Sequence, residues 1–280
     1  MKKISRRSFL AAAAVSAAAL ALTACGGSAS TASSAAASSV AASSEAASTS
    51  AAAAELTTVE AGKLTMATNA AFPPYEMTTD AGEFEGIDIE TAQAIADKLG
   101  LELQIDDMDF DAALLSVQQG KADIVMAGVT VTDERKAVMD FSDSYATGIQ
   151  SIIVPEGSDI ASPDDLAGKK IGTQRGTTGY IYCSDDFGDD NVVAYDDGLT
   201  AVQALNNGQV DAVVIDNAPA QEFVAANPGL VILDTSYAEE DYAIGMAKGS
   251  SLEDAVNAAL KELKADGTLQ SIVDKYITAE

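Results

Sequence analysis

The side chains best suited to chemistry lie in the run Gly-Val-Thr-Val-Thr-Asp-Glu-Arg that begins at Gly128. The apolar residues 124–127 before it predict a buried strand that ends at Gly128, where another group can approach the backbone closely. Thr132 is the expected N-cap of a short helix with acidic residues in its first turn. Gly128 and Thr130 offer backbone N–H groups and Arg135 adds a planar fork of donors, a set that suits one carboxylate. The same residues also fit a plain strand-to-helix turn with an arginine facing solvent, because arginine is commonly exposed.

A second candidate anion site follows another predicted strand. Residues 170–174 predict that strand, and the Arg-Gly-Thr-Thr-Gly run after it leads through a glycine turn into the start of a helix. Thr177 and Thr178 supply hydroxyl and N–H groups there, and a helix N-terminus is a good anion site. The signal is weak alone, because a threonine at this position often only caps its helix.

An internal repeat relates these two regions. Residues 116–126 (Ser-Val-Gln-Gln-Gly-Lys-Ala-Asp-Ile-Val-Met) match residues 204–214 (Ala-Leu-Asn-Asn-Gly-Gln-Val-Asp-Ala-Val-Val) at an offset of 88 residues. Each copy is typical of a helix end, a glycine cap, a turn containing Asp and a buried strand. The repeat places Asp216 where the first copy has Gly128, at the carboxyl end of the equivalent strand. Ligands of open α/β sheets bind at that edge, so two facing lobes would set Asp216 opposite residues 128–135.

The remaining elements predict the lobes that position these groups. Strands alternate with helices along the chain, which predicts an α/β fold with mostly parallel sheets. Two expected crossings, at residues 140–155 and 234–241, make the first lobe discontinuous. We therefore predict two α/β lobes joined by two hinge crossings, with lobe 1 over residues 58–148 and 240–280 and lobe 2 over residues 149–239.

The candidate residues together suit an α-amino acid. Such a ligand needs a carboxylate grip, an acceptor for its ammonium group and a pocket for its side chain. Asp216 suits the ammonium group, and Phe72 and Phe110 are placed to flank an apolar or planar side chain. In the alternative interpretation both phenylalanines are core residues and Asp216 only caps a helix ahead of Pro219.

Six stretches of the chain form a set that resembles one protein family. They are Phe72-Pro73-Pro74-Tyr75, Gly86-Ile87-Asp88-Ile89, Gly128 to Arg135, Asp140-Phe141-Ser142-Asp143, Gln174 to Gly179, and Val210-Asp211-Ala212-Val213-Val214. Together they resemble the family 3 solute-binding proteins, the extracytoplasmic receptors of polar amino-acid ABC transporters. The resemblance covers nearly everything from about Gly62 to the C-terminus. It implies a periplasmic-binding-protein-like (type II) fold, whose two lobes close on a ligand, and a binding protein rather than an enzyme.

The resemblance also implies a set of ligand-binding residues, grouped by the part of the amino acid that each would contact. The groups are Arg135, Thr130, Thr177 and Thr178 for the α-carboxylate; Gly128 and Asp216 for the α-amino group; Phe72 and Phe110 for the faces of the side chain; and Asn69 and Gln174 for its tip.

Two positions bear on the choice of ligand. Asn69 stands where family members that bind basic amino acids often carry Asp, which disfavours lysine and arginine. Arg175, next to the threonine pair, would favour an acidic side chain if it faced the pocket. We expect a neutral polar amino acid such as glutamine, delivered to an ABC transporter permease and its ATPase. The alternatives are an enzyme that resembles cyclohexadienyl dehydratases on the same fold, and a lipoprotein that senses a ligand for a signalling partner.

The N-terminus predicts export and a lipid anchor. Four basic residues and an apolar run that ends at Leu22 predict a signal peptide over residues 1–24, for the general or the twin-arginine pathway. Leu-Thr-Ala-Cys followed by Gly resembles a lipobox, which implies lipid (palmitate) attachment at Cys25. Residues 25–57 are mostly Ala, Ser and Thr and predict a flexible tether. We therefore expect an extracytoplasmic protein anchored to the outer face of the cytoplasmic membrane.

Composition excludes several classes of partner and chemistry. The chain has 16 Lys and Arg against 43 Asp and Glu, a net charge of −27, which disfavours nucleic acid as a partner. With Cys25 lipidated, Cys183 has no intrachain partner for a disulfide. Because the chain lacks histidine, we expect no metal site, no cofactor and no His-dependent catalysis. We expect a monomer.

Overall fold

The structure is a computed structural model that describes residues 56–277. The predicted signal peptide, the lipid attachment at Cys25 and most of the tether lie outside these residues. No helix within the described range is long and apolar enough to cross a membrane. In chain order the elements are β1 (Lys63–Thr68), β2 (Ala71–Phe72), β3 (Glu76–Thr78), β4 (Phe84–Glu85), α1 (Ile87–Leu99), β5 (Glu102–Asp107), α2 (Phe110–Gln118), β6 (Ile124–Val125), α3 (Asp133–Val138), β7 (Met139–Phe141), β8 (Ala146–Pro155), the 3₁₀ helix η1 (Pro163–Leu166), β9 (Ile171–Gln174), α4 (Thr178–Phe187), the 3₁₀ helix η2 (Asp189–Asn191), β10 (Val192–Tyr195), α5 (Gly198–Asn206), β11 (Ala212–Asp216), α6 (Asn217–Ala226), β12 (Leu230–Ile232), β13 (Ala238–Tyr242), β14 (Gly245–Ala247), α7 (Glu253–Ala265) and α8 (Thr268–Tyr276).

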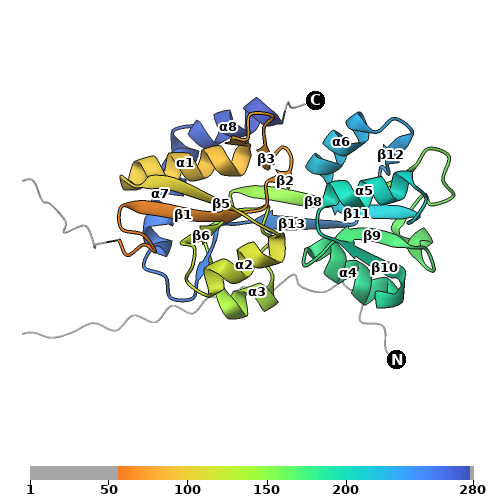
Figure 1. Ribbon diagram of the computed structural model, residues 1–280, viewed down its shortest axis with the longest axis horizontal. Coiled ribbons are helices and arrows are strands. Elements are labelled where there is room, and N and C mark those ends of the chain that lie inside the picture. The colour runs from red at the N-terminus through yellow and green to blue at the C-terminus, as the bar shows by residue number, and fades with distance from the viewer. Residues whose placement is uncertain (1–55, 278–280) are drawn as a thin grey trace, which may run out of the picture. The chain divides into compact units, whose positions relative to one another are not determined.

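Lobe 1 is built on a five-stranded sheet in the order β5-β1-β6-β14-β7. β5, β1 and β6 are parallel, whereas β14 runs antiparallel to both of its neighbours. α1 packs against α7 and α8 on one face of the sheet, and α2 covers the opposite face (Figure 1). α1 buries Ile89, Ala92 and Ile95, which recur at helical spacing, and it ends at Gly100 in the left-handed conformation.

Lobe 2 is built on a second sheet in the order β10-β9-β11-β8-β12, with β13 added along β8. α5 and α6 lie on one face of this sheet and α4 on the other (Figure 1). The two-lobed α/β prediction is confirmed, but the expectation of mostly parallel sheets is wrong in detail, because β8, β12, β13 and β14 all pair antiparallel. β8 in lobe 2 and β14 in lobe 1 run opposite to the parallel strands that they join.

The two crossings between the lobes are β8 and β13 (Figure 1). They pair antiparallel, with residues 146–150 opposite residues 238–242, and the rest of β8 pairs with β11 and β12 in lobe 2. The predicted lobe boundaries fall inside these two strands. Two paired strands that cross between lobes can act as a hinge, because backbone changes at a few of their residues would move one lobe relative to the other.

The internal repeat is present in the structure as one helix–turn–strand unit in each lobe. α2, a turn and β6 form the first copy, and α5, a turn and β11 form the second. In the first copy the Asp123 carboxylate accepts the backbone N–H of Thr65 on β1 at 2.7 Å. In the second the Asp211 carboxylate accepts the N–H of Lys170, just before β9, at 2.7 Å. The matching aspartates therefore tie matching turns to matching strands.

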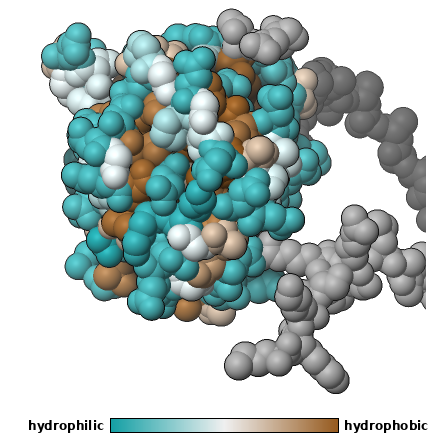
Figure 2. Space-filling view, turned by 90° about the vertical axis from the view of Figure 1, so that its right-hand side faces the viewer, coloured by the Kyte–Doolittle hydropathy of each residue, from teal (hydrophilic) through white to brown (hydrophobic). Residues whose placement is uncertain are grey.

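Lobe 2 has a buried cysteine in its core and a mostly hydrophilic outer end. Cys183 is fully buried in an apolar cluster of lobe 2, and burial raises the pKa of its thiol to about 12, which makes it an inert core residue. The end of the molecule formed by lobe 2 is mostly hydrophilic, with hydrophobic side chains gathered in one part of it (Figure 2).

Candidate functional site

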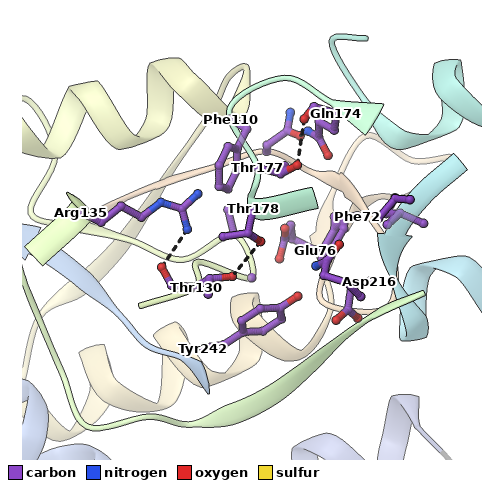
Figure 3. A pocket seen from close by; sticks show the side chains of 16 residues that line it. Phe72, Glu76, Phe110, Thr130, Arg135, Gln174, Thr177, Thr178, Asp216 and Tyr242 are labelled. Carbon is purple, nitrogen blue, oxygen red and sulfur yellow. Dashed lines mark hydrogen bonds between the residues drawn. The ribbon is translucent and has the colours of Figure 1, made fainter. Parts of the chain in front are cut away.

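One pocket between the two lobes brings together all ten residues that the sequence predicted to bind a ligand. Six further residues also line it: Glu76, Ala127, Gln150, Val214, Ile215 and Tyr242. Figure 3 shows Arg135 on one side of this pocket and Asp216 on the other, with the threonines between them. Whether the ten residues contact a ligand stays a prediction, but their convergence is a structural fact.

Arg135 is buried rather than facing solvent, so the alternative of an exposed arginine is wrong. Its side chain donates from Nη1 to the carbonyl oxygen of Thr130 at 2.8 Å and from Nη2 to that of Gly176 in lobe 2 at 3.1 Å. Its guanidinium carbon lies 5.4 Å from the ring centre of Phe110. α3 holds this geometry, because Thr132 is its N-cap and accepts the N–H of Arg135 at 3.2 Å. One arginine thus contacts both lobes.

The hydroxyl groups of Thr130 and Thr178 are bound to Glu240, which the sequence analysis missed. Glu240 Oε2 accepts from Thr130 at 3.0 Å, from Thr178 at 2.9 Å and from Nε2 of Gln150 at 3.0 Å. Burial lowers the pKa of Arg135, and attraction to Glu240 is the largest effect that opposes this. The alternation along β13 places Glu240 on the same buried face as Tyr242, a signal that sequence alone could have offered.

Thr177 serves mainly as a cap in this structure. Its hydroxyl accepts the N–H of Tyr180 at 3.3 Å and donates to the carbonyl of Gln174 at 2.8 Å. This geometry starts α4 at Thr178, whose N–H therefore has no intrahelical acceptor. The Thr177 hydroxyl is therefore used locally, and anion binding by the first-turn N–H groups stays a prediction.

Asp216 lines the pocket and also caps a helix, and its role toward an ammonium group stays a prediction. It caps α6, accepting the N–H of Ala218 at 3.1 Å, and it also accepts the N–H of Ile149 on β8 at 2.8 Å. Burial raises its pKa to about 6, which hydrogen bonds from Tyr242 and these backbone groups oppose. At neutral pH it is therefore mostly a fixed carboxylate in the wall of the pocket.

Gly128 offers less than predicted. Its N–H donates to Oδ2 of Asp88 at 3.0 Å, so the expectation that this N–H helps to bind a ligand carboxylate is wrong. Its carbonyl oxygen is the group left to meet a ligand. The residue adopts a φ of +55°, and a Cβ there would come within 2.9 Å of the Phe72 ring. Both constraints explain why glycine stands here.

The predicted tip of the pocket is a pair of side-chain amides from the two lobes. Nε2 of Gln174 donates to Oδ1 of Asn69 at 2.8 Å and to the carbonyl of Asp196 at 3.3 Å. Nδ2 of Asn69 donates to the carbonyl of Met108 at 3.0 Å. With the amides oriented by this network, Asn69 keeps one N–H and Gln174 keeps its carbonyl oxygen for a ligand.

Arg175 does not take part in the pocket. Its guanidinium donates to the carbonyl of Ala194 at 3.3 Å and lies 3.7 Å from the Asp196 carboxylate, and its side chain is 55% exposed. The idea that it selects an acidic side chain therefore has no support in the structure.

A pair of buried acids, of which Glu76 lines the pocket, was not predicted as part of the site. Glu76 and Asp88 are both fully buried, and Asp88 also accepts the Tyr145 hydroxyl at 2.8 Å. Burial raises the pKa of Asp88 to about 6. Burial and then the adjacent Asp88 charge raise the pKa of Glu76 well above its ordinary value. Asp88 belonged to a motif recognised in the sequence, but nothing in that motif showed that it would meet Glu76.

The lobes and the pocket between them define a two-lobed solute-binding protein. The space inside the pocket is about 30 Å³ in this closed form, enough for one or two water molecules, so a larger solute enters only if the lobes separate or side chains move. Residues 64–279 match the model of the bacterial extracellular solute-binding proteins, family 3, and the chain belongs to that family. It is therefore an extracytoplasmic solute-binding protein.

Several relatives have known ligands. The chain is 33% identical over 226 residues to the L-cystine-binding protein TcyJ of Escherichia coli strain K12. This match covers 79% of this chain and 85% of the relative. It is 34% identical over 228 residues to the arginine-binding extracellular protein ArtP of Bacillus subtilis strain 168, covering 78% and 87%. The crystal structure of an ancestral arginine-binding protein bound to glutamine matches with a TM-score of 0.74 and 41% identity, covering 78% and 99%. These relatives are named for binding, which confirms the expectation of a binding protein rather than an enzyme.

Proposed function

We propose that the chain binds a polar L-amino acid between its lobes and delivers it to an ABC transporter permease. The observation that carries this proposal is one pocket with a buried arginine from lobe 1 on one side and a buried aspartate from lobe 2 on the other. A small zwitterion satisfies both charges at once. The relatives named for binding cystine and arginine support the same class of ligand.

The α-carboxylate would be bound by Arg135 and by the first-turn N–H groups of α4. Arg135 carries five N–H donors, of which the closed form directs two to backbone carbonyls, so others remain. The N–H of Thr178 adds a donor at a helix N-terminus. Because their hydroxyls already donate to Glu240, we assign Thr130 and Thr178 to this end through their backbones. Asp216 and the Gly128 carbonyl would receive the ammonium group.

The tip of the pocket favours a carboxamide side chain. Asn69 keeps one N–H donor and Gln174 keeps one carbonyl acceptor, which is the complement of a primary amide. A guanidinium or ammonium group has donors only and would leave the Asn69 N–H facing another donor. Phe72 and Phe110 would lie against the faces of the side chain. Glutamine is therefore the proposed ligand, and an ancestral arginine-binding protein has been solved with glutamine bound.

A cationic amino acid is the second candidate. The buried carboxyl groups of Glu76 and Asp216 line the same pocket and would attract an extra positive charge. The similarity to ArtP points the same way. The number of carboxyl groups favours arginine, whereas the donor and acceptor pattern at the tip favours glutamine.

Titration calorimetry with a panel of amino acids tests this proposal. We expect micromolar or tighter binding of glutamine, weaker binding of arginine, histidine and cystine, and no heat from glutamate. Tighter binding of arginine than glutamine would overturn the side-chain assignment alone. No binding of any amino acid would overturn the proposed function.

Transport would follow from closure of the lobes. The ligand binds the open form and stabilises the closed one through contacts to both lobes, and the closed form docks on the permease, whose ATPase partner supplies the energy. We further propose a monomer that is anchored to the membrane by lipid at Cys25. Metabolic labelling with palmitate, compared with a Cys25→Ser variant, tests that anchor.

A further inference from the structure

Glu76 on β3 is a fully buried carboxyl group with no hydrogen-bond donor. It lines the pocket, and neither of its oxygens accepts a hydrogen bond from any residue in the range 56–277. Its polar neighbour Asp88 is another acid, to which a protonated Glu76 can donate but which, once ionised, has no proton to give in return. Burying a carboxyl group without a donor costs free energy, and native proteins rarely leave such a group without a reason. Within residues 56–277, then, nothing donates a hydrogen bond to Glu76.

The neighbouring carboxylates differ from Glu76 because backbone groups hold them. Asp88 accepts the N–H of Gly128, and Asp216 accepts two backbone N–H groups. These two are fixed in place before any ligand arrives. Glu76 has no such support, although it lies on the same side of the pocket as Asp216, across from Arg135 (Figure 3). The donors that it lacks are those that an ammonium group carries.

We propose that Glu76 is a further ligand-binding residue that gives up its proton when the ligand's ammonium group binds. The carboxyl O–H bond breaks, the proton leaves to solvent, and the carboxylate formed accepts an N–H of the ammonium group. At this end of the pocket the positive charge of the ammonium group enters as that of the proton leaves. The ligand's carboxylate enters at the Arg135 end, so the site as a whole becomes more negative by one charge. The proposal rests on the proposed amino-acid function, and it adds Glu76 to Asp216 as an acceptor for that group.

The surroundings of Glu76 explain why a cation is needed to release this proton. The titratable groups around Glu76 are Asp88, Asp107, Asp216 and the tyrosines Tyr75 and Tyr145, and none of them is a cation. Burial and the three aspartates hold the pKa of Glu76 well above its ordinary value. A bound ammonium group supplies the opposite charge and lowers that pKa. Affinity should therefore rise with pH between the pKa of the bound form and that of the free form, and level off outside this window.

The test is titration calorimetry with L-glutamine and L-arginine in phosphate and in Tris, two buffers that differ in their heat of ionisation. We would work from pH 7 to 8.5, where Asp88 and Asp216, with pKa values of about 6, are already mostly ionised. The wild-type protein should release up to about one proton per ligand, seen as a binding heat that differs between the buffers. Glu76→Gln keeps the shape of the neutral acid, so it should fold, release no proton and bind about tenfold or more weakly at pH 8. The matched control is Glu85→Gln, which neutralises an exposed glutamate on β4 and should behave as wild type.

The possible results separate the two proposals. Equal heats in both buffers for a wild-type protein that binds its ligand would overturn this inference and leave the proposed function intact. The inference is also wrong if Glu76→Gln binds as tightly as wild type and still releases a proton. A wild-type protein that binds no amino acid would overturn both proposals. Because the buffer comparison uses the unmodified protein, it decides the matter even if the variant fails to fold.

Discussion

The two lobes use the same helix–turn–strand unit and finish it with opposite chemistry. In lobe 1, β6 ends at Val125, and residues 126–132, which include Gly128, connect it to α3, whose buried arginine supplies a positive charge. In lobe 2 the chain leaves β11 at Asp216 and enters α6 at once, so the aspartate is both the strand end and the helix cap. The longer connection in lobe 1 lets the Arg135 side chain turn back to the pocket. The direct connection in lobe 2 places the Asp216 carboxylate at the pocket. The same scaffold thus produces both ends of a site for a zwitterion.

The two ends also differ in the hydrogen bonds that their buried glutamates accept. At the Arg135 end, Oε2 of Glu240 accepts three, from Thr130 in lobe 1, Thr178 in lobe 2 and Gln150 on the hinge strand β8, whereas its Oε1 accepts none from the described residues. At the opposite end, Glu76 has no donor within the described part of the chain. The first end is built to hold the lobes together, and the second is left for the ligand to complete. Variants at each end therefore test this difference.

Removing the positive charge should have the largest effect. Arg135→Ala deletes the cation that binds the α-carboxylate and leaves that group buried without a partner. We expect affinity for the amino acid to fall on the order of a hundredfold or more, or about 3 kcal/mol. Titration calorimetry measures the loss, and circular dichroism should show an unchanged fold.

The control for this variant is Arg175→Ala, which removes an exposed arginine outside the pocket. It should bind as wild type does. Arg135→Lys keeps the charge but loses the planar fork, so it should fall between the two. If Arg135→Ala binds normally, the carboxylate is held elsewhere and the comparison of the two ends fails.

Neutralising the other end should have a smaller effect that depends on pH. Asp216→Asn removes the ionised acceptor but keeps a carbonyl oxygen, so we expect a loss of about thirtyfold at pH 7.5, or about 2 kcal/mol. In the wild-type protein, burial raises the pKa of Asp216 to about 6. Protonation below that value removes the charge that binds the ammonium group, so affinity should fall as the pH drops from 7 to 5.

Binding measured across this range checks the prediction. The part of the pH dependence that belongs to Asp216 should be absent in Asp216→Asn, because asparagine does not titrate. A variant with the same slope as wild type would show that another group, such as Asp88 with its own pKa of about 6, controls the dependence.

Sequence reasoning found the lobes, the repeat and most of the residues that meet in the pocket from local pattern, whereas Asn69 and Gln174 came only from the resemblance to a family. Thr132 caps α3, and the offset of 88 residues places Asp216 opposite Gly128, without knowledge of distant contacts. The sequence did not predict which residues far apart in the chain would contact one another. The N–H of Gly128 is taken by Asp88, 40 residues away in the chain. No local pattern specifies such a pair.

The same limit explains the acids that were missed. Glu240 contacts Thr130 across 110 residues of sequence, and it reaches the pocket wall only because two crossing strands pair. Among 43 acidic residues, most are expected on the surface, so composition gives no reason to single out Glu76 or Glu240. Their importance comes from burial, which only the folded structure shows.

The smallest predicted effect compares the two copies of the repeat directly. Asp123 is buried and accepts the N–H groups of Val59 and Thr65, each at 2.7 Å, whereas Asp211 is exposed and accepts only that of Lys170. Asparagine can accept through one side-chain oxygen, so Asp123→Asn leaves a backbone N–H facing a donor. We expect Asp123→Asn to lower the free energy of unfolding by about 1.5 kcal/mol and Asp211→Asn by about 0.5 kcal/mol or less.

Urea unfolding followed by circular dichroism distinguishes the two variants through their midpoints, provided that the slope with denaturant stays unchanged. Ligand affinity should not change in either variant, because neither aspartate lines the pocket. Equal losses would show that burial does not separate the two copies, and that the turns contribute alike despite their different surroundings. A larger loss for Asp211→Asn would reverse the comparison, since it would make the exposed hydrogen bond stronger than the buried pair.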